Sequence, residues 1–87
     1  MPLQMGGGVN CEYIPTDLNN LTIGQTARYI PSTLNKPEDG YGVCITFGET
    51  VWLWQIAFTS TTANRFHLRS NINKEGWSSW QKFQAVN

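Results

Sequence analysis

Polar side chains alternate along one stretch near the C-terminus and continue into the turn that follows it. The residues concerned are Arg65, His67, Arg69, Asn71, Asn73 and Trp77. Alternate positions of a β-strand share one face. Proteins bind sugars with flat aromatic rings and with planar polar groups that hydrogen-bond to hydroxyls or pair with acidic substituents. We therefore expect these six residues to form a carbohydrate-binding surface on the solvent side of a strand.

The aromatic side chains have alternative roles. Trp52, Trp54 and Trp80 suit a core or a subunit interface, and Trp77 suits either such packing or contact with a ligand. Arg69 also has a second role open to it, because a guanidinium stacks on indole rings and hydrogen-bonds within a sheet. The sequence leaves these alternatives open.

Residues with catalytic spacing are not apparent. His67 is the single histidine, and the sequence places no nucleophile or carboxylate beside it. The acidic residues are scattered, so the facing carboxylate pair of a glycosidase is not indicated. The run Gly6-Gly7-Gly8 lacks the Lys-Ser/Thr that follows a phosphate-binding loop, and no metal-ligand cluster is present. We expect a non-enzymatic protein without a metal or cofactor.

Composition narrows the possible partners. The 87 residues include six basic and six acidic ones. A neutral chain does not have the basic excess of a nucleic-acid-binding module or of a membrane-surface helix. The sequence has no apolar run long enough to cross a bilayer and no visible signal peptide. We expect neither nucleic-acid binding nor membrane insertion.

The two cysteines, Cys11 and Cys44, have no metal-binding spacing. Cys44 lies between Val43 and Ile45 in a strand-like run, which favours a small core residue with a free thiol. A bridge between Cys11 and Cys44 remains an open alternative.

Alternation and turn residues predict a single all-β domain over residues 11–87, after a flexible linker or fragment edge at residues 1–10. Asp17 is expected to cap a turn or 3₁₀ segment whose leucines, Leu18 and Leu21, close one end of the core. The charged loop of residues 32–40 is expected to be exposed. The predicted strands are Gly24–Ile30, Tyr41–Phe47, Val51–Thr59, Asn64–Ile72 and Trp77–Phe83. Short connections favour an antiparallel meander curled into a small sandwich or barrel-like sheet.

Two strands carry particular expectations about their faces. Val51–Thr59 is apolar on both faces, which favours cover on both sides, by a partner subunit or by a tightly curled sheet. In Asn64–Ile72, the apolar positions are expected to face inward and the Arg65–Asn71 row to face solvent. In the last strand, strict alternation places Trp77 and Trp80 on opposite faces.

A longer pattern resembles a known family. The strand with Gln55, the strand with Arg69, the run Gly76-Trp77-Ser78-Ser79-Trp80 and the apolar Phe83 are similar to the end of phage tail-fibre modules. These modules include the C-terminal knob domains of R-type pyocin fibres. Upstream, Asp17-Leu18-Asn19-Asn20-Leu21 before a glycine and a strand is also similar, so the resemblance covers residues 16–84. This chain lacks the residue that the family has between glycine and tryptophan, so its turn is one residue shorter.

The resemblance implies a homotrimeric tip domain in a virion, outside the cell at the host surface. Its expected function is non-enzymatic attachment to a bacterial surface polysaccharide or lipopolysaccharide by several weak sites. Two alternatives remain. One is a structural trimerisation or folding cap without a ligand, and the other is a monomeric carbohydrate-binding module of a depolymerase.

Overall fold

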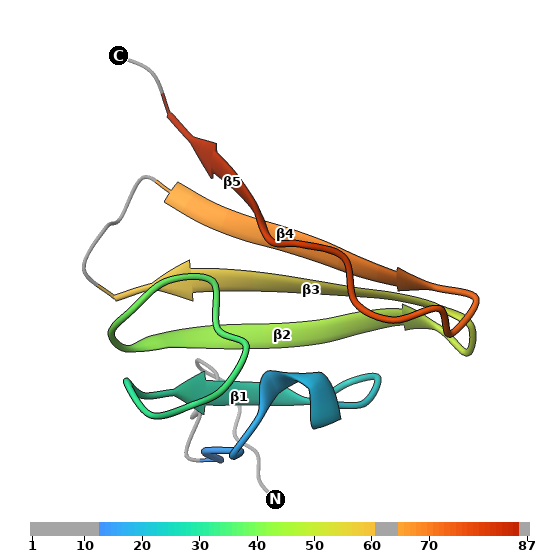
Figure 1. The fold of residues 1–87 in the computed structure, drawn as a ribbon, viewed down its shortest axis with the longest axis horizontal. Coiled ribbons are helices and arrows are strands. Elements are labelled where there is room, and N and C mark those ends of the chain that lie inside the picture. The colour runs from blue at the N-terminus through green and yellow to red at the C-terminus, as the bar shows by residue number, and fades with distance from the viewer. Residues whose placement is uncertain (1–12, 61–64, 86–87) are drawn as a thin grey trace, which may run out of the picture.

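The computed structural model describes residues 13–60 and 65–85, which form one five-stranded antiparallel sheet (Figure 1). The strands pair in chain order, so the predicted all-β meander is confirmed. Their bounds are β1 Thr26–Tyr29, β2 Gly42–Glu49, β3 Trp52–Thr59, β4 Arg65–Ile72 and β5 Gln81–Gln84. The predicted linker and Cys11 lie outside the described residues.

The 3₁₀ turn η1, Leu18–Asn20, precedes the sheet. The Asp17 carboxylate accepts a hydrogen bond from the backbone N–H of Asn19 at 2.8 Å, which confirms the predicted cap. Leu18 and Leu21 are both buried and join the hydrophobic core. The apolar side of this short turn therefore packs on the sheet as the sequence indicates.

One face of the sheet, which we call the covered face, is packed by the chain's own connections. Figure 1 shows η1, the loop between β1 and β2 and the segment between β4 and β5 on the same side of the sheet. Thr33 of that loop is buried, so the loop is not wholly exposed as expected. The sheet residues of the core are small or polar-tipped: Ala27, Tyr29, Cys44 and Ala57.

The opposite face, which we call the open face, carries large apolar side chains without cover from the described residues. Strand register places Ile45, Ile56 and Leu68 in one row across β2, β3 and β4. Several of its side chains remain more than a third exposed: Phe47, Trp52, Phe58, Ile72 and Phe83. Residues 13–60 and 65–85 therefore do not meet the expectation that β3 is covered on both sides.

The face assignment for β4 is wrong. His67 and Arg69 are 4% and 5% exposed, whereas Ile72 is 37% exposed. Because Cys44 pairs through Ala57 to His67, these polar residues share the core side of the sheet. A polar residue takes a buried position when partners satisfy it, and those partners come from other segments, which alternation alone does not reveal.

Candidate functional site

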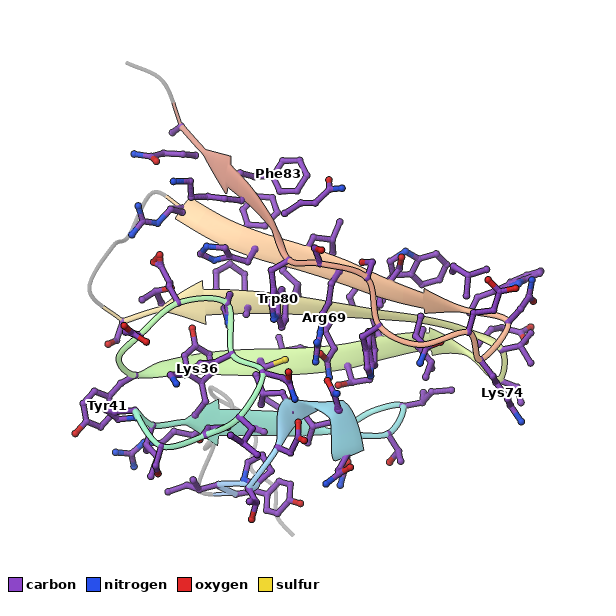
Figure 2. The ribbon with its side chains drawn as sticks, in the orientation of Figure 1. Lys36, Tyr41, Arg69, Lys74, Trp80 and Phe83 are labelled. Carbon is purple, nitrogen blue, oxygen red and sulfur yellow. The ribbon has the colours of Figure 1, made fainter. Side chains whose placement is uncertain are left out.

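Arg69 is the centre of the polar layer on the covered face (Figure 2). Its Nε donates to Gln55 Oε1 at 2.7 Å. The Gln55 amide in turn donates to the Leu18 carbonyl at 2.8 Å and to Thr46 Oγ1 at 3.1 Å. Gln55 is fully buried, and its oxygen and both of its N–H groups are matched to these partners. This network ties β2, β3 and β4 to the N-terminal 3₁₀ turn.

Two indole rings enclose the Arg69 guanidinium. Its central carbon lies 4.6 Å from the centroid of Trp77 and 4.5 Å from that of Trp80. Trp80 is fixed further, because its Nε1–H donates to the Asn35 carbonyl at 2.9 Å. The stacking alternative for Arg69 is confirmed. Burial lowers the pKa of Arg69 to about 10, so the side chain stays cationic at neutral pH, which cation–π stacking requires.

A β-bulge brings the two tryptophans to the same face. Leu68 pairs with Gln81, but the Ser78 N–H donates to the Ser70 carbonyl at 2.8 Å. Leu68 and Ser70 are two residues apart in β4, whereas their partners Gln81 and Ser78 are three residues apart. The segment before β5 therefore holds one extra residue. The predicted strand Trp77–Phe83 is therefore wrong in its first half. Its strict alternation, which separated Trp77 from Trp80, fails for the same reason.

A second polar group lies at the other end of β4. The Glu38 carboxylate, from the loop before β2, accepts hydrogen bonds from Arg65 Nη2 at 2.8 Å and from Thr59 Oγ1 at 3.3 Å. His67 Nε2 lies 3.7 Å from the other Glu38 oxygen. Burial lowers the pKa of His67, while the negative charge of Glu38 partly opposes that effect. Arg65 and His67 thus hold the loop on the sheet.

The remaining predicted site residues lie at the end of β4 and in the segment that follows it. Asn71 Oδ1 accepts from the Gly76 N–H at 3.1 Å, which closes the turn. Asn73 and Lys74 have left-handed φ angles of 57° and 61°, and asparagine tolerates this conformation better than most residues. Asn73 is exposed, while Asn71 and Trp77 are partly buried. The structure therefore does not gather the six predicted residues on one solvent-facing surface.

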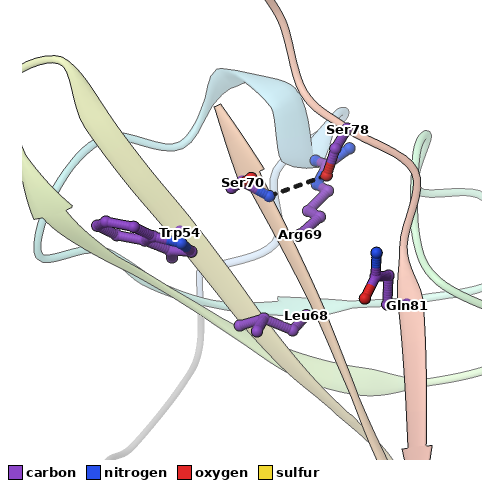
Figure 3. Close-up of a pocket in the computed structure, with 6 residues that line it drawn as sticks. All are labelled: Trp54, Leu68, Arg69, Ser70, Ser78 and Gln81. Atoms are coloured by element: carbon purple, nitrogen blue, oxygen red, sulfur yellow. Dashed lines mark hydrogen bonds between the residues drawn. The ribbon is translucent and has the colours of Figure 1, made fainter. Parts of the chain in front are cut away.

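The bulge also shapes a recess with a volume of about 110 Å³, which Figure 3 shows in close-up. Register places Trp54 beside Ser70, and Leu68 beside Gln81, on the open face. Ser78 lies at the bulge, where its Oγ accepts from the Ser70 N–H at 3.1 Å. The recess is lined by Trp54, Leu68, Arg69, Ser70, Ser78 and Gln81.

Sequence reasoning missed two parts of this arrangement. Glu38 belongs to the charged loop that the sequence predicts to be exposed, and no local signal connects it to Arg65 across 27 positions. Ser70, Ser78 and Gln81 lie within the predicted strands, and the alternation pattern assigns them no binding role. The one-residue shortening between Gly76 and Trp77 was a usable signal, because a changed turn length alters which residues meet across a hairpin.

Among the residues that the structure describes, no group of three or more histidine, cysteine or acidic side chains is placed to hold a metal ion. The same part of the chain contains no helix long and apolar enough to cross a membrane. No protein-family model, curated protein sequence or solved structure matches this chain.

Proposed function

We propose that this chain is the receptor-binding tip domain of a phage or tailocin tail fibre. It assembles as a homotrimer and attaches to a bacterial surface glycan without catalysing a reaction. The observation that carries the proposal is the open face, since a meander with one face covered and the other apolar needs further protein on that second face. The run from Gly76 to Phe83, which resembles the end of phage tail-fibre modules, supports the same assignment.

The size of the open face supports cover by copies of the same chain. Its five most exposed apolar side chains are 37–48% exposed. At roughly 200 Å² for each large side chain, they leave about 400 Å² of apolar surface. The half-buried apolar residues around them add to this area, which already matches the largest patch of a typical monomer, about 300–600 Å². A standard interface buries about 800 Å² on each partner, so this face supplies much of one.

The charges on the open face favour self-association. Register places Arg28 beside Val43 and Glu49 beside Trp52, so one cation and one anion lie toward opposite ends of β2. The rows between them are uncharged. A surface with one charge of each sign and an apolar centre can meet a copy of itself without like-charge repulsion. This favours a second copy over a partner of high net charge.

Attachment by the trimer follows from multivalency. Three equivalent weak sites on one rigid particle raise the effective concentration at a cell surface, so the particle stays bound when one site releases. Four of the predicted ligand residues have access to solvent: Arg65, Asn71, Asn73 and Trp77. The buried His67 and Arg69 act in this proposal as supports for the surface.

A structural trimerisation cap without a ligand is the second candidate. The observation that favours it is the burial of His67 and Arg69, since a cap uses its polar residues internally. It predicts a trimer that does not adsorb to cells. The depolymerase-module alternative instead predicts a monomer that binds sugar.

The first experiment is light scattering on the purified chain. We expect a mass near 29 kDa, which is three times the 9.8 kDa of one chain. Phe58→Glu introduces a charge on the open face at a side chain that is 44% exposed, and we expect it to lower the mass to that of one folded chain. Leu34→Glu is the matched control, because Leu34 is 55% exposed and lies in the covering loop. A wild-type mass of 9.8 kDa contradicts assembly through this face.

The second experiment measures adsorption of the fluorescently labelled trimer to a panel of bacterial strains. We expect binding to some strains and its loss after mild periodate oxidation, which cleaves sugar diols. Adsorption that periodate leaves unchanged contradicts a glycan receptor whose sugars carry vicinal diols. A trimer that adsorbs to none of the strains favours the structural cap.

A further inference from the structure

We infer that the recess at the β4–β5 bulge binds one neutral sugar residue of the glycan. This inference rests on the proposed function and assigns its ligand contact to a place that the sequence did not indicate. The recess combines an indole ring with small hydroxyl-bearing residues and an amide. An aromatic face beside convergent polar groups is the usual composition of a sugar site.

The polar groups of the recess are available to a ligand. The Ser70 hydroxyl and the Gln81 carboxamide make no hydrogen bond with another described residue. Ser78 Oγ accepts from the Ser70 N–H and donates to the Ser79 carbonyl at 3.1 Å, which leaves one lone pair. Ser78 and Gln81 are exposed. Hydroxyl groups of a sugar can therefore find both donors and acceptors here.

The walls of the recess are apolar and fixed. Trp54 stacks on Phe47 with ring centroids 6.2 Å apart, which holds the indole in place at the wall of the recess. Leu68 lies in the neighbouring row of the sheet. A preformed apolar wall binds the C–H groups of a pyranose at low entropic cost, because its side chains are already ordered.

The charge of the recess selects the class of sugar. Arg69 contributes to the lining, but register and stacking direct its guanidinium to the covered face between Trp77 and Trp80. The other lining side chains are uncharged. A carboxylate or phosphate group would lose its hydration here without gaining a charged partner. A neutral hexose or N-acetylhexosamine is therefore the expected ligand, rather than an acidic sugar.

The size and position of the recess fit a single residue of a chain. Its volume of about 110 Å³ corresponds to roughly three or four waters at about 30 Å³ each, which admits part of one ring. The recess adjoins β5, the last strand of the sheet. Ile72 and Phe83 of the same open face flank this end, so a polysaccharide reaches the recess only in an assembly whose second copy leaves Ser70, Ser78 and Gln81 uncovered.

The test is an NMR titration of the ¹⁵N-labelled chain. Glucose, galactose, N-acetylglucosamine and glucuronic acid are added in turn, and the indole N–H signals report binding. We expect at least one neutral sugar to shift the Trp54 signal, while the Trp80 signal, held by Asn35, stays in place. Ser70→Leu fills the recess and should weaken this binding about tenfold or more. Thr26→Leu is the matched control, because Thr26 lies on the open face beside Ile45 at the far edge of the sheet.

The outcomes separate this inference from the proposed function. Wild-type protein that adsorbs to cells, together with Ser70→Leu protein that adsorbs equally, overturns the recess as the site and leaves the receptor-binding function standing. Wild-type protein that neither adsorbs nor shows a Trp54 shift overturns both. A Trp54 shift with glucuronic acid alone contradicts the neutral ligand class. A Trp54 signal that instead depends on protein concentration, and on no sugar, shows that a side chain of a second copy fills the recess.

Discussion

Replacement of Arg69 by alanine tests the polar layer of the covered face directly. The change leaves the Gln55 oxygen buried without its 2.7 Å donor, which costs about 1–3 kcal/mol. It also removes the contacts with Trp77 and Trp80, and a desolvated cation–π contact is worth about 2 kcal/mol. Burial of a guanidinium is itself unfavourable, as its lowered pKa indicates, so the net loss is smaller than the sum. We expect about 2–3 kcal/mol of destabilisation.

The assay is urea unfolding followed by tryptophan fluorescence at a fixed chain concentration. A loss of about 2–3 kcal/mol is a large part of the roughly 5 kcal/mol that a domain of this size has available. Arg28→Ala is the matched control, since Arg28 is exposed on a strand, and we expect less than about 0.5 kcal/mol. Arg69→Lys keeps the charge but loses the planar stack, so it should recover less than half of the loss. Equal midpoints for wild type and Arg69→Ala would refute the reasoning.

Two further predictions concern single positions. The pKa of His67 is lower in the folded chain than in the unfolded chain. As pH falls below about 6.5, the unfolded chain therefore takes up a proton that the folded chain does not, and the folded state loses stability. Urea midpoints at pH 7.5 and 5 should therefore differ more in wild type than in His67→Gln, and equal differences would contradict a buried neutral imidazole. A Cβ at Gly42 would collide with the Tyr29 ring and the Phe58 carbonyl, so Gly42→Ala should destabilise the fold by about 1–3 kcal/mol. Gly40→Ala is a contrasting variant, because a Cβ at Gly40 meets no neighbour within 4 Å and only the positive φ of Gly40 opposes the change. Similar melting temperatures for wild type and Gly42→Ala would contradict the close approach of Gly42 to Tyr29 and Phe58.

The sequence predicted those features that depend on local rules. Alternation located four strands and the second half of the fifth, and the short connections indicated antiparallel neighbours. Asp17 marked the 3₁₀ turn by the ordinary chemistry of a helix cap. The excess of apolar residues in β3 predicted cover on both faces, and the described residues cover one of them.

The parts that failed depend on contacts between distant segments. Which face of β4 is buried is decided by Gln55, Trp77 and Trp80, and none of these lies within four residues of Arg69. The apolar face of β4 looked like the core because hydrophobic residues are usually inside. Here the core side holds small and polar residues, several of them hydrogen-bonded to one another, and the described residues leave the apolar side exposed.

The bulge determines which side chains lie on each face of the sheet. One extra residue before Gln81 turns Trp77 and Trp80 to the covered face, where they enclose Arg69. The same residue sets Ser78 against Ser70, which leaves small side chains beside Trp54 on the open face. The stacked arginine therefore holds the shape of the recess, although its charge lies on the other side. Arg69→Lys should then weaken sugar binding at the recess without any lost ligand contact, whereas Arg28→Ala should leave it unchanged.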